Sequence, residues 1–145
     1  MTNITKLRTR VSPEAISKVT RIFNGTLDDI FNELFQNARR AGATRIDVTA
    51  EHMADACLIT ISDDGAGLSL EKIRHRAIDR GLLEPDSVPD EHTLTQMIMQ
   101  SGFSTADEVT TLAGRGVGMD VVRNETASLG GRIEISTVSG KGATF

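Results

Sequence analysis

The chain has 145 residues and a formal net charge of −4 at pH 7; 39% of its residues are hydrophobic and 25% are charged. This size and composition are typical of one globular domain, and no apolar run is long enough to span a bilayer. The negative balance argues against non-specific nucleic-acid binding, and the start has no apolar export signal. We therefore predict a single cytoplasmic domain over 1–145 that binds neither nucleic acid nor membrane.

The first third of the chain predicts two helices. Residues 1–11 are expected to be flexible, and a helix is expected over 13–23, with Ser12 as its cap and proline at its first position. A second helix is predicted over 28–41, because apolar residues repeat there at three- and four-residue spacing and Gly42 follows.

Two strands are predicted next. Apolar and polar residues alternate over 46–50 and again from 57 to 61, which indicates a half-buried hairpin. Cys57, the only cysteine, is interpreted as a small core residue of the second strand. A single cysteine excludes an internal disulfide and a cysteine-based zinc site.

The remaining elements predict an α+β fold, a two-layer sandwich with a mainly antiparallel sheet and helices on one face. The middle of the chain is expected to form a helix over 69–81, a surface loop over 84–91, a short helix over 93–100 and a mobile segment over 101–115. A further helix is expected over 117–129. The end is expected to form a strand over 132–138, a turn over 139–142 and a last strand from Ala143 that breaks off at Phe145.

A glycine run is the most informative motif. Gly114, Gly116 and Gly118 alternate with Arg115 and Val117 and lead into the helix expected from 117. Glycines at a helix start expose backbone N–H groups to which a phosphate chain can bind. The spacing is not that of the dinucleotide-binding fingerprint, and the chain contains no P-loop lysine motif.

Two polar residues lie on one side of the second predicted helix. Glu33 and Asn37 are four residues apart, beside the apolar Ile30 and Leu34. The pair fits an ordinary polar helix flank. It also fits a metal-and-water site, in which Asn37 offers a carbonyl oxygen to magnesium and Glu33 acts as a base for an attacking water.

An Asp/Gly segment follows the second strand. Asp63 lies where that strand ends, and a carboxylate there can accept a hydrogen bond from an exocyclic amine, with Gly65 and Gly67 leaving room for a planar ring. The same dipeptide chemistry also favours a plain turn. Near the end of the chain, the turn over 140–144 brings a Thr144 hydroxyl that can contact a phosphate or Asp63.

In this order the four motifs resemble those of the ATP-binding superfamily shared by DNA gyrase, heat-shock chaperones, histidine kinases and MutL-type mismatch-repair ATPases. The resemblance covers 26–145 and implies the Bergerat-type fold with ATP and magnesium as cofactors. It implies that Asn37 is the magnesium ligand, that Asp63 accepts the adenine amine and that Gly65 and Gly67 pack on the ring. It also implies that 114–118 is the phosphate loop, that 68–113 includes the ATP lid, that Thr144 is the threonine of the last motif and that the final strand is truncated.

The two halves resemble different branches. From Asp63 onward, the segments 101–106, 114–122 and 129–135 are similar to the catalytic domain of chemotaxis-type histidine kinases. Residues 33–48 are similar instead to mismatch-repair ATPases, in which the glutamate at the place of Glu33 activates water; the chemotaxis branch has a histidine there. Arg40 matches the basic residue that many histidine kinases place on the γ-phosphate.

Three functions follow from the resemblance. In the favoured one, part of two-component signalling, Asn37-bound magnesium and Arg40 neutralise the phosphates while a histidine on a separate phosphoacceptor or dimerisation domain, in the same or another chain, attacks. His52, His75 and His92 are expected to be surface residues rather than that acceptor. The alternatives are ATP hydrolysis with Glu33 as general base, and an ATP-dependent switch without chemistry.

Overall fold

The computed structural model describes residues 3–10, 27–103 and 118–145. The described chain divides into two compact units, and the single domain predicted from the sequence stays a prediction. The sheet unit comprises residues 1–68 and 136–145, and the helical unit comprises residues 69–135. The helix expected over 13–23 lies outside the described residues.

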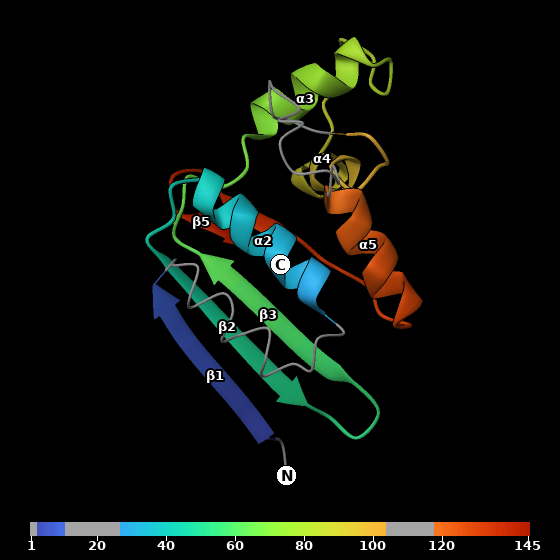
Figure 1. The fold of residues 1–145 in the computed structure, drawn as a ribbon. Coiled ribbons are helices and arrows are strands. Elements are labelled where there is room, and N and C mark those ends of the chain that lie inside the picture. The colour runs from blue at the N-terminus through green and yellow to red at the C-terminus, as the bar shows by residue number, and fades with distance from the viewer. Residues whose placement is uncertain (1–2, 11–26, 104–117) are drawn as a thin grey trace. The chain divides into compact units, whose positions relative to one another are not determined.

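The sheet unit contains a five-stranded antiparallel sheet in the order β1-β2-β3-β5-β4 (Figure 1). Its strands are β1 (Asn3–Arg10), β2 (Arg45–His52), β3 (Cys57–Asp63), β4 (Ser136–Val138) and β5 (Gly142–Thr144). The α+β class and the antiparallel sheet predicted from the sequence are therefore confirmed.

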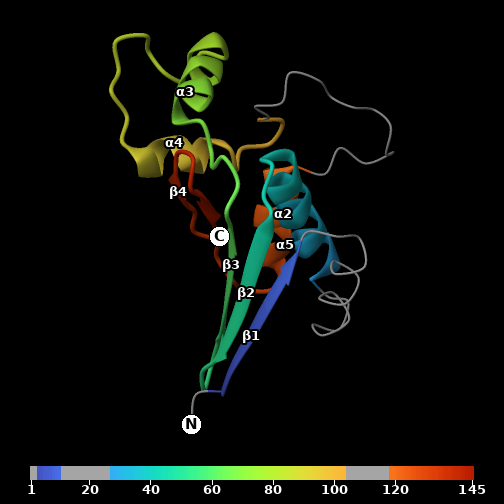
Figure 2. The ribbon, with the colours of Figure 1, turned by 90° about the vertical axis from the view of Figure 1, so that its left-hand side faces the viewer.

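One helix, α2 (Asp28–Arg40), lies on one face of this sheet (Figure 2). Its buried apolar face consists of four residues at helical spacing: Phe31, Leu34, Phe35 and Ala38. The facing positions of the central strands are also buried: Ile46, Val48, Ala50 and Ile61. Burial of these alternating positions stabilises the two layers and fixes the register of β2, because a one-residue slip would turn its apolar set outward.

The start of the chain differs from its prediction as a flexible segment. Residues Asn3–Arg10 form an edge strand that pairs with the whole of β2, from Asn3↔His52 to Arg10↔Arg45. The period-two pattern is present, because Thr5, Leu7 and Thr9 alternate with basic residues. A charge at every second position is typical of an edge strand. The pattern is weak because Leu7 is the only apolar residue on the opposite face.

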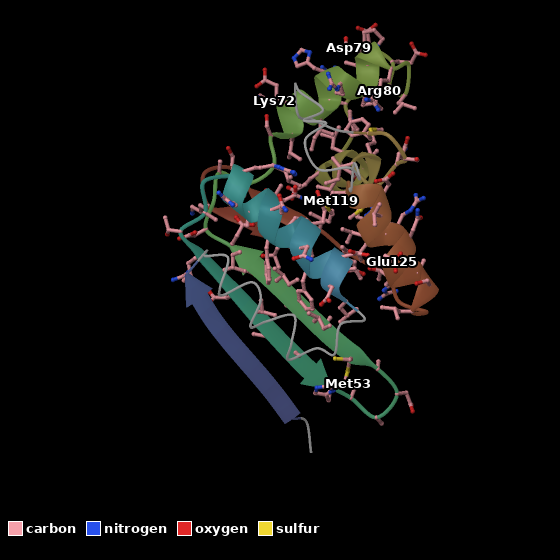
Figure 3. The ribbon with its side chains drawn as sticks, viewed as in Figure 1. Met53, Lys72, Asp79, Arg80, Met119 and Glu125 are labelled. Carbon is pink, nitrogen blue, oxygen red and sulfur yellow. The ribbon has the colours of Figure 1, made fainter. Side chains whose placement is uncertain are left out.

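Two further details correct the sequence predictions. Cys57 is exposed rather than in the core, because it is the first residue of β3 and pairs with the exposed His52 at the far end of the hairpin, beside Met53 (Figure 3). The strand predicted over 132–138 is limited to Ser136–Val138. Its pairing with β5 runs from Ser136↔Thr144 to Val138↔Gly142.

The helical unit contains α3 (Leu70–Asp79), α4 (Glu91–Met97) and α5 (Met119–Ser128). Side-chain caps begin two of them: the Ser69 hydroxyl accepts from Lys72 N at 3.2 Å, and Asp90 Oδ1 accepts from Thr93 N at 2.8 Å. Such caps satisfy the unpaired N–H groups of a first turn. The short helix predicted over 93–100 begins and ends earlier than expected.

Arg80 fastens the end of α3 to the turn that follows α4 within this unit. Its Nη1 donates to the Gly102 carbonyl at 2.7 Å, and its guanidinium lies 5.2 Å from the centroid of the buried Phe103 ring (Figure 3). Among the described residues, no helix combines the length and apolar character needed to cross a bilayer.

Asp64 ties the end of β3 to the loop between α2 and β2. Its Oδ1 accepts from the backbone N–H groups of Thr44 at 2.7 Å and Arg45 at 2.8 Å, and its Oδ2 accepts from the Thr44 hydroxyl at 2.7 Å. Donors aimed at the ionised form lower the pKa of Asp64 to about 2, and the hydrogen bond from the Thr44 side chain is the largest cause.

We predict a pH-dependent cost for Asp64→Asn. Because the folded-state pKa lies below the ordinary value of 3.8, the contribution of Asp64 to stability is complete above that value and is lost as the pH falls toward about 2. Urea unfolding of both proteins should therefore show a difference in unfolding free energy that is constant from neutral pH to about pH 5 and shrinks at about pH 3.

The matched control is Asp86→Asn in the exposed loop between α3 and α4. A loss of stability for Asp64→Asn that is the same at about pH 3 as at neutral pH would contradict the role assigned to the ionised carboxylate.

Candidate functional site

The candidate site is centred on the loop that follows β3, residues 63–68. On one flank the backbone N–H of Ala66 donates to the Ala41 carbonyl at 2.8 Å, at the end of α2. On the other flank the N–H of Gly140 donates to the Ala66 carbonyl at 2.9 Å, and the N–H of Leu68 donates to the Thr137 hydroxyl at 2.8 Å. The loop is therefore bonded both to the end of α2 and to the β4–β5 hairpin.

Asp63 is the last residue of β3, at the start of this loop, and its side chain is half-buried. Its Oδ1 accepts from the backbone N–H of Gly65 at 2.8 Å, which fixes the carboxylate in place. Burial raises the pKa of Asp63, while backbone hydrogen bonds from Gly65 and Ala143 oppose that rise. A desolvated carboxylate at the end of a central strand is available to a buried hydrogen-bond donor of a ligand.

Three predicted residues meet on the last two turns of α2. The Arg40 Nη1 donates to Asn37 Oδ1 at 3.1 Å and lies 3.6 Å from Glu33 Oε1. The Glu33 side chain is 7% exposed and that of Arg40 is 59% exposed. A buried carboxylate, a half-buried amide and a mostly exposed guanidinium thus form one polar cluster, in which the guanidinium offsets the charge of Glu33.

Thr144 contacts a neighbour of Asp63. Its hydroxyl lies 2.9 Å from that of Ser62, and the two residues are paired in register between β5 and β3. Analysis of the sequence alone gave Ser62 no role. The sequence signal for such a role is its position in β3 immediately before Asp63.

The glycines of the loop are required by close packing inside the protein. A Cβ on Gly65 would lie 2.8 Å from Ala41 Cβ and 2.9 Å from Asp63 Oδ1. Gly67 has φ +74°, and its Cβ would lie 2.8 Å from the Thr137 hydroxyl. Any larger residue would push the loop away from α2 or from β4, so these positions need glycine whether or not a ligand ring also packs there.

Three residues that carry the geometry were missed as contributors. Asp64 and Thr44 join β3 to the end of α2, and the buried Thr137 both accepts from Leu68 N and donates to the Gly142 carbonyl at 3.1 Å. All three act through contacts between distant parts of the sequence, and no local motif marks such contacts.

The predicted phosphate loop belongs to the other unit. Gly118 precedes α5 as its N-cap, and α5 begins at the buried Met119, two residues later than the helix predicted over 117–129. Gly114, Arg115, Gly116 and Val117 lie outside the described residues. The role of this loop stays a prediction.

Sequence comparison gives the class of protein to which this α+β fold belongs. Residues 24–145 match the family described as histidine kinase-, DNA gyrase B- and HSP90-like ATPases. The chain belongs to this family. The expected superfamily is thereby confirmed.

Individual relatives are chemotaxis proteins CheA. That of Rhizobium meliloti is 44% identical over 98 residues, which is 68% of this chain and 13% of the relative. That of Klebsiella aerogenes is 37% identical over 144 residues, 97% of this chain and 22% of the relative. That of Bacillus subtilis is 38% identical over 104 residues, 70% of this chain and 15% of the relative.

This chain therefore corresponds to a minor part of each of these longer proteins. The matches identify it as an ATP-binding catalytic domain of the histidine kinase type. The similarity to the chemotaxis branch that the sequence predicts is confirmed.

Gly142 offers a test of the contact between β5 and the candidate site. It has φ +113°, and a Cβ there would collide with the Asp63 carbonyl oxygen. Gly140 has φ +74° with no atom within 4 Å of a Cβ. We predict that Gly140→Ala costs about 1 kcal/mol of backbone strain, whereas Gly142→Ala costs at least about 3 kcal/mol or prevents folding.

Urea unfolding of the two variants beside the wild type measures this difference. Equal losses at the two positions would contradict the close approach of β5 to Asp63.

Proposed function

We propose that the chain binds magnesium-ATP and donates the γ-phosphoryl group to a histidine on a separate domain or protein. The observation that carries this proposal is the ion pair between Arg40 and the buried Glu33, at 3.6 Å. A carboxylate paired with a guanidinium is a poorer base for water than an unpaired one, which disfavours hydrolysis. The similarity to chemotaxis proteins CheA supports the same choice.

At the nucleoside end of the proposed site, Asp63 accepts a hydrogen bond from the adenine amine. Its place at the end of β3 and its fixed Oδ1 support this role. Gly65 and Gly67 would bring the backbone close to the ring as well as to the protein. The Thr144 hydroxyl lies 2.9 Å from that of Ser62, the residue before Asp63, and we assign it to the same end of the site.

At the phosphate end, Asn37 is the proposed magnesium ligand. Its amide oxygen fits the way proteins bind this ion, through one or two oxygens together with substrate phosphates. The bound ion would supply charge neutralisation on the β- and γ-phosphates. Arg40, on the next turn of the helix and 59% exposed, is placed to contribute a second positive charge.

We also propose that 114–118 forms the phosphate-binding loop and that 68–113 includes a lid over the nucleotide. Backbone N–H groups at the start of α5, which Gly118 precedes, would bind the phosphates. Arg115 and Val117 lie within that loop. The acceptor histidine belongs to a phosphoacceptor or dimerisation domain in the same or another chain, and the transfer is part of cytoplasmic two-component signalling. The histidines of the described residues, His52, His75 and His92, are exposed, as the sequence predicts, and none of them is proposed as the acceptor.

Hydrolysis is the second candidate function, and one observation favours it. Glu33 is a buried carboxylate four residues before Asn37 on α2, about one turn from the proposed metal ligand. A carboxylate at that place is able to orient a water toward the γ-phosphate once Arg40 moves away. If the chain binds ATP without transferring or hydrolysing its γ-phosphate, it acts as an ATP-dependent switch module.

We predict that Asp63→Asn separates binding from stability. Losing a charge-assisted acceptor should weaken ATP binding at least about tenfold. Burial raises the pKa of Asp63, so the folded state loses stability as the pH rises from the ordinary value of 3.8 through the raised pKa, and the loss is complete at neutral pH. The neutral amide removes this cost while its oxygen still accepts from Gly65. Calorimetric titration with ATP and thermal unfolding at neutral pH should therefore show weaker binding with an undiminished Tm; unchanged ATP affinity would refute the adenine assignment.

Glu33→Gln decides between transfer and hydrolysis. The chain is incubated with magnesium and γ-labelled ATP, with or without the histidine phosphotransfer domain of a chemotaxis relative. We expect label on the acceptor histidine with wild type and with Glu33→Gln alike, because Glu33 is not the nucleophile's base. Loss of free phosphate release in Glu33→Gln, with no label on any histidine, would favour the hydrolase. If the chain binds ATP but neither labels a histidine nor releases phosphate, the ATP-dependent switch without chemistry is the function that remains.

A further inference from the structure

One nitrogen atom serves both polar residues of the α2 cluster. Arg40 Nη1 donates to the side-chain oxygen of Asn37 at 3.1 Å and lies 3.6 Å from Glu33 Oε1. The side-chain amide of Asn37 has one oxygen, and the Arg40 guanidinium donates to it. This oxygen is also the atom assigned to magnesium under the proposed function.

Two cations on one oxygen repel each other strongly. Magnesium binds oxygen at about 2.1 Å, so with Arg40 Nη1 at 3.1 Å from the same atom the two positive charges lie within about 5 Å of each other. That separation is shorter than the Debye length of about 8 Å at physiological salt, so dissolved ions screen the repulsion only in part.

We propose that Arg40 is the resident cation of the magnesium position: it occupies the Asn37 oxygen in the nucleotide-free chain and leaves it when metal and ATP bind. This inference rests on the proposed function and assigns to Arg40 a role beyond contact with the γ-phosphate. Arg40 and the metal then compete for Asn37, and each partly replaces the other as a countercharge for the nucleotide.

The burial of the three side chains supports this exchange. The Arg40 side chain is 59% exposed, so its guanidinium has room to turn toward a bound phosphate. The Glu33 side chain is 7% exposed and fixed in the helix face. Glu33 therefore keeps the guanidinium near the site when Asn37 releases it, because an uncompensated buried carboxylate is costly.

Two measurements on Arg40→Met test the exchange. The first is ATP affinity in EDTA, where Arg40 is the remaining countercharge of the cluster; we expect it to fall about tenfold, the size of one charge-assisted hydrogen bond. The second is the midpoint for Mn²⁺ binding to the ATP-saturated chain, followed by the paramagnetic signal of the free ion. We expect it to move several-fold to lower concentration, because the competitor is gone.

Arg39→Met is the matched control, since Arg39 is the preceding exposed arginine of the same helix end. It should change neither the ATP affinity in EDTA nor the Mn²⁺ midpoint. Arg40→Lys is the second variant, which retains a charge without the planar guanidinium, and its Mn²⁺ midpoint should lie between those of wild type and Arg40→Met.

A Mn²⁺ midpoint that is unchanged or higher in Arg40→Met would overturn the competition, and so would an equal shift in Arg39→Met. If Arg40→Met does not fold, as judged by circular dichroism, Arg40→Lys decides by the same midpoint. Wild-type protein that fails to bind ATP under either condition would refute the proposed function itself. Wild-type binding without a shift in the variants would refute this inference alone.

Discussion

The site depends on the hydrogen bonds that hold residues 63–68 between two neighbours. Asp64 bonds this loop to the segment between α2 and β2, and Ala66 bonds it to Ala41 at the end of α2. Thr137 and Gly140 bond it to the β4–β5 hairpin. Glycines allow both approaches, because side chains at 65 and 67 would collide with Ala41 and Thr137. Asp63 therefore projects from a loop that cannot move without breaking contacts on both sides, which is the preorganisation a binding site needs.

The same bonds place the polar cluster of α2. Since the loop is fastened to Ala41, one residue beyond Arg40, the last turns of α2 are tied to the end of β3. Within those turns, a single guanidinium offsets the buried charge of Glu33 and is bonded to Asn37. The chemistry open to Glu33 and Asn37 consequently depends on where Arg40 is, and a phosphate-bearing ligand would change that position.

Local patterns predict much of this, but contacts between distant segments do not show in them. The apolar spacing and Gly42 predict α2 closely, and alternation predicts β2 and β3. Thr44 and Asp64 are 20 residues apart, and Leu68 and Thr137 are 69 apart, so no window of sequence reveals their bonds. Strand β1 was missed because Leu7 is the only apolar residue on the face opposite its basic residues, so the alternation is weak. Strand β4 is shorter than predicted, and its pairing with β5 covers Ser136–Val138.

The central claim is that the loop after β3 and the end of α2 bind opposite ends of ATP. Backbone and side-chain amide chemical shifts of ¹⁵N-labelled chain, recorded during titration with ATP before and after magnesium is added, test it most directly. The account predicts that ATP alone shifts the Gly65 amide and that the Asn37 side-chain amide shifts further only when magnesium follows. Shifts that leave both unchanged and fall instead on the far hairpin end, at 53–57, would contradict it.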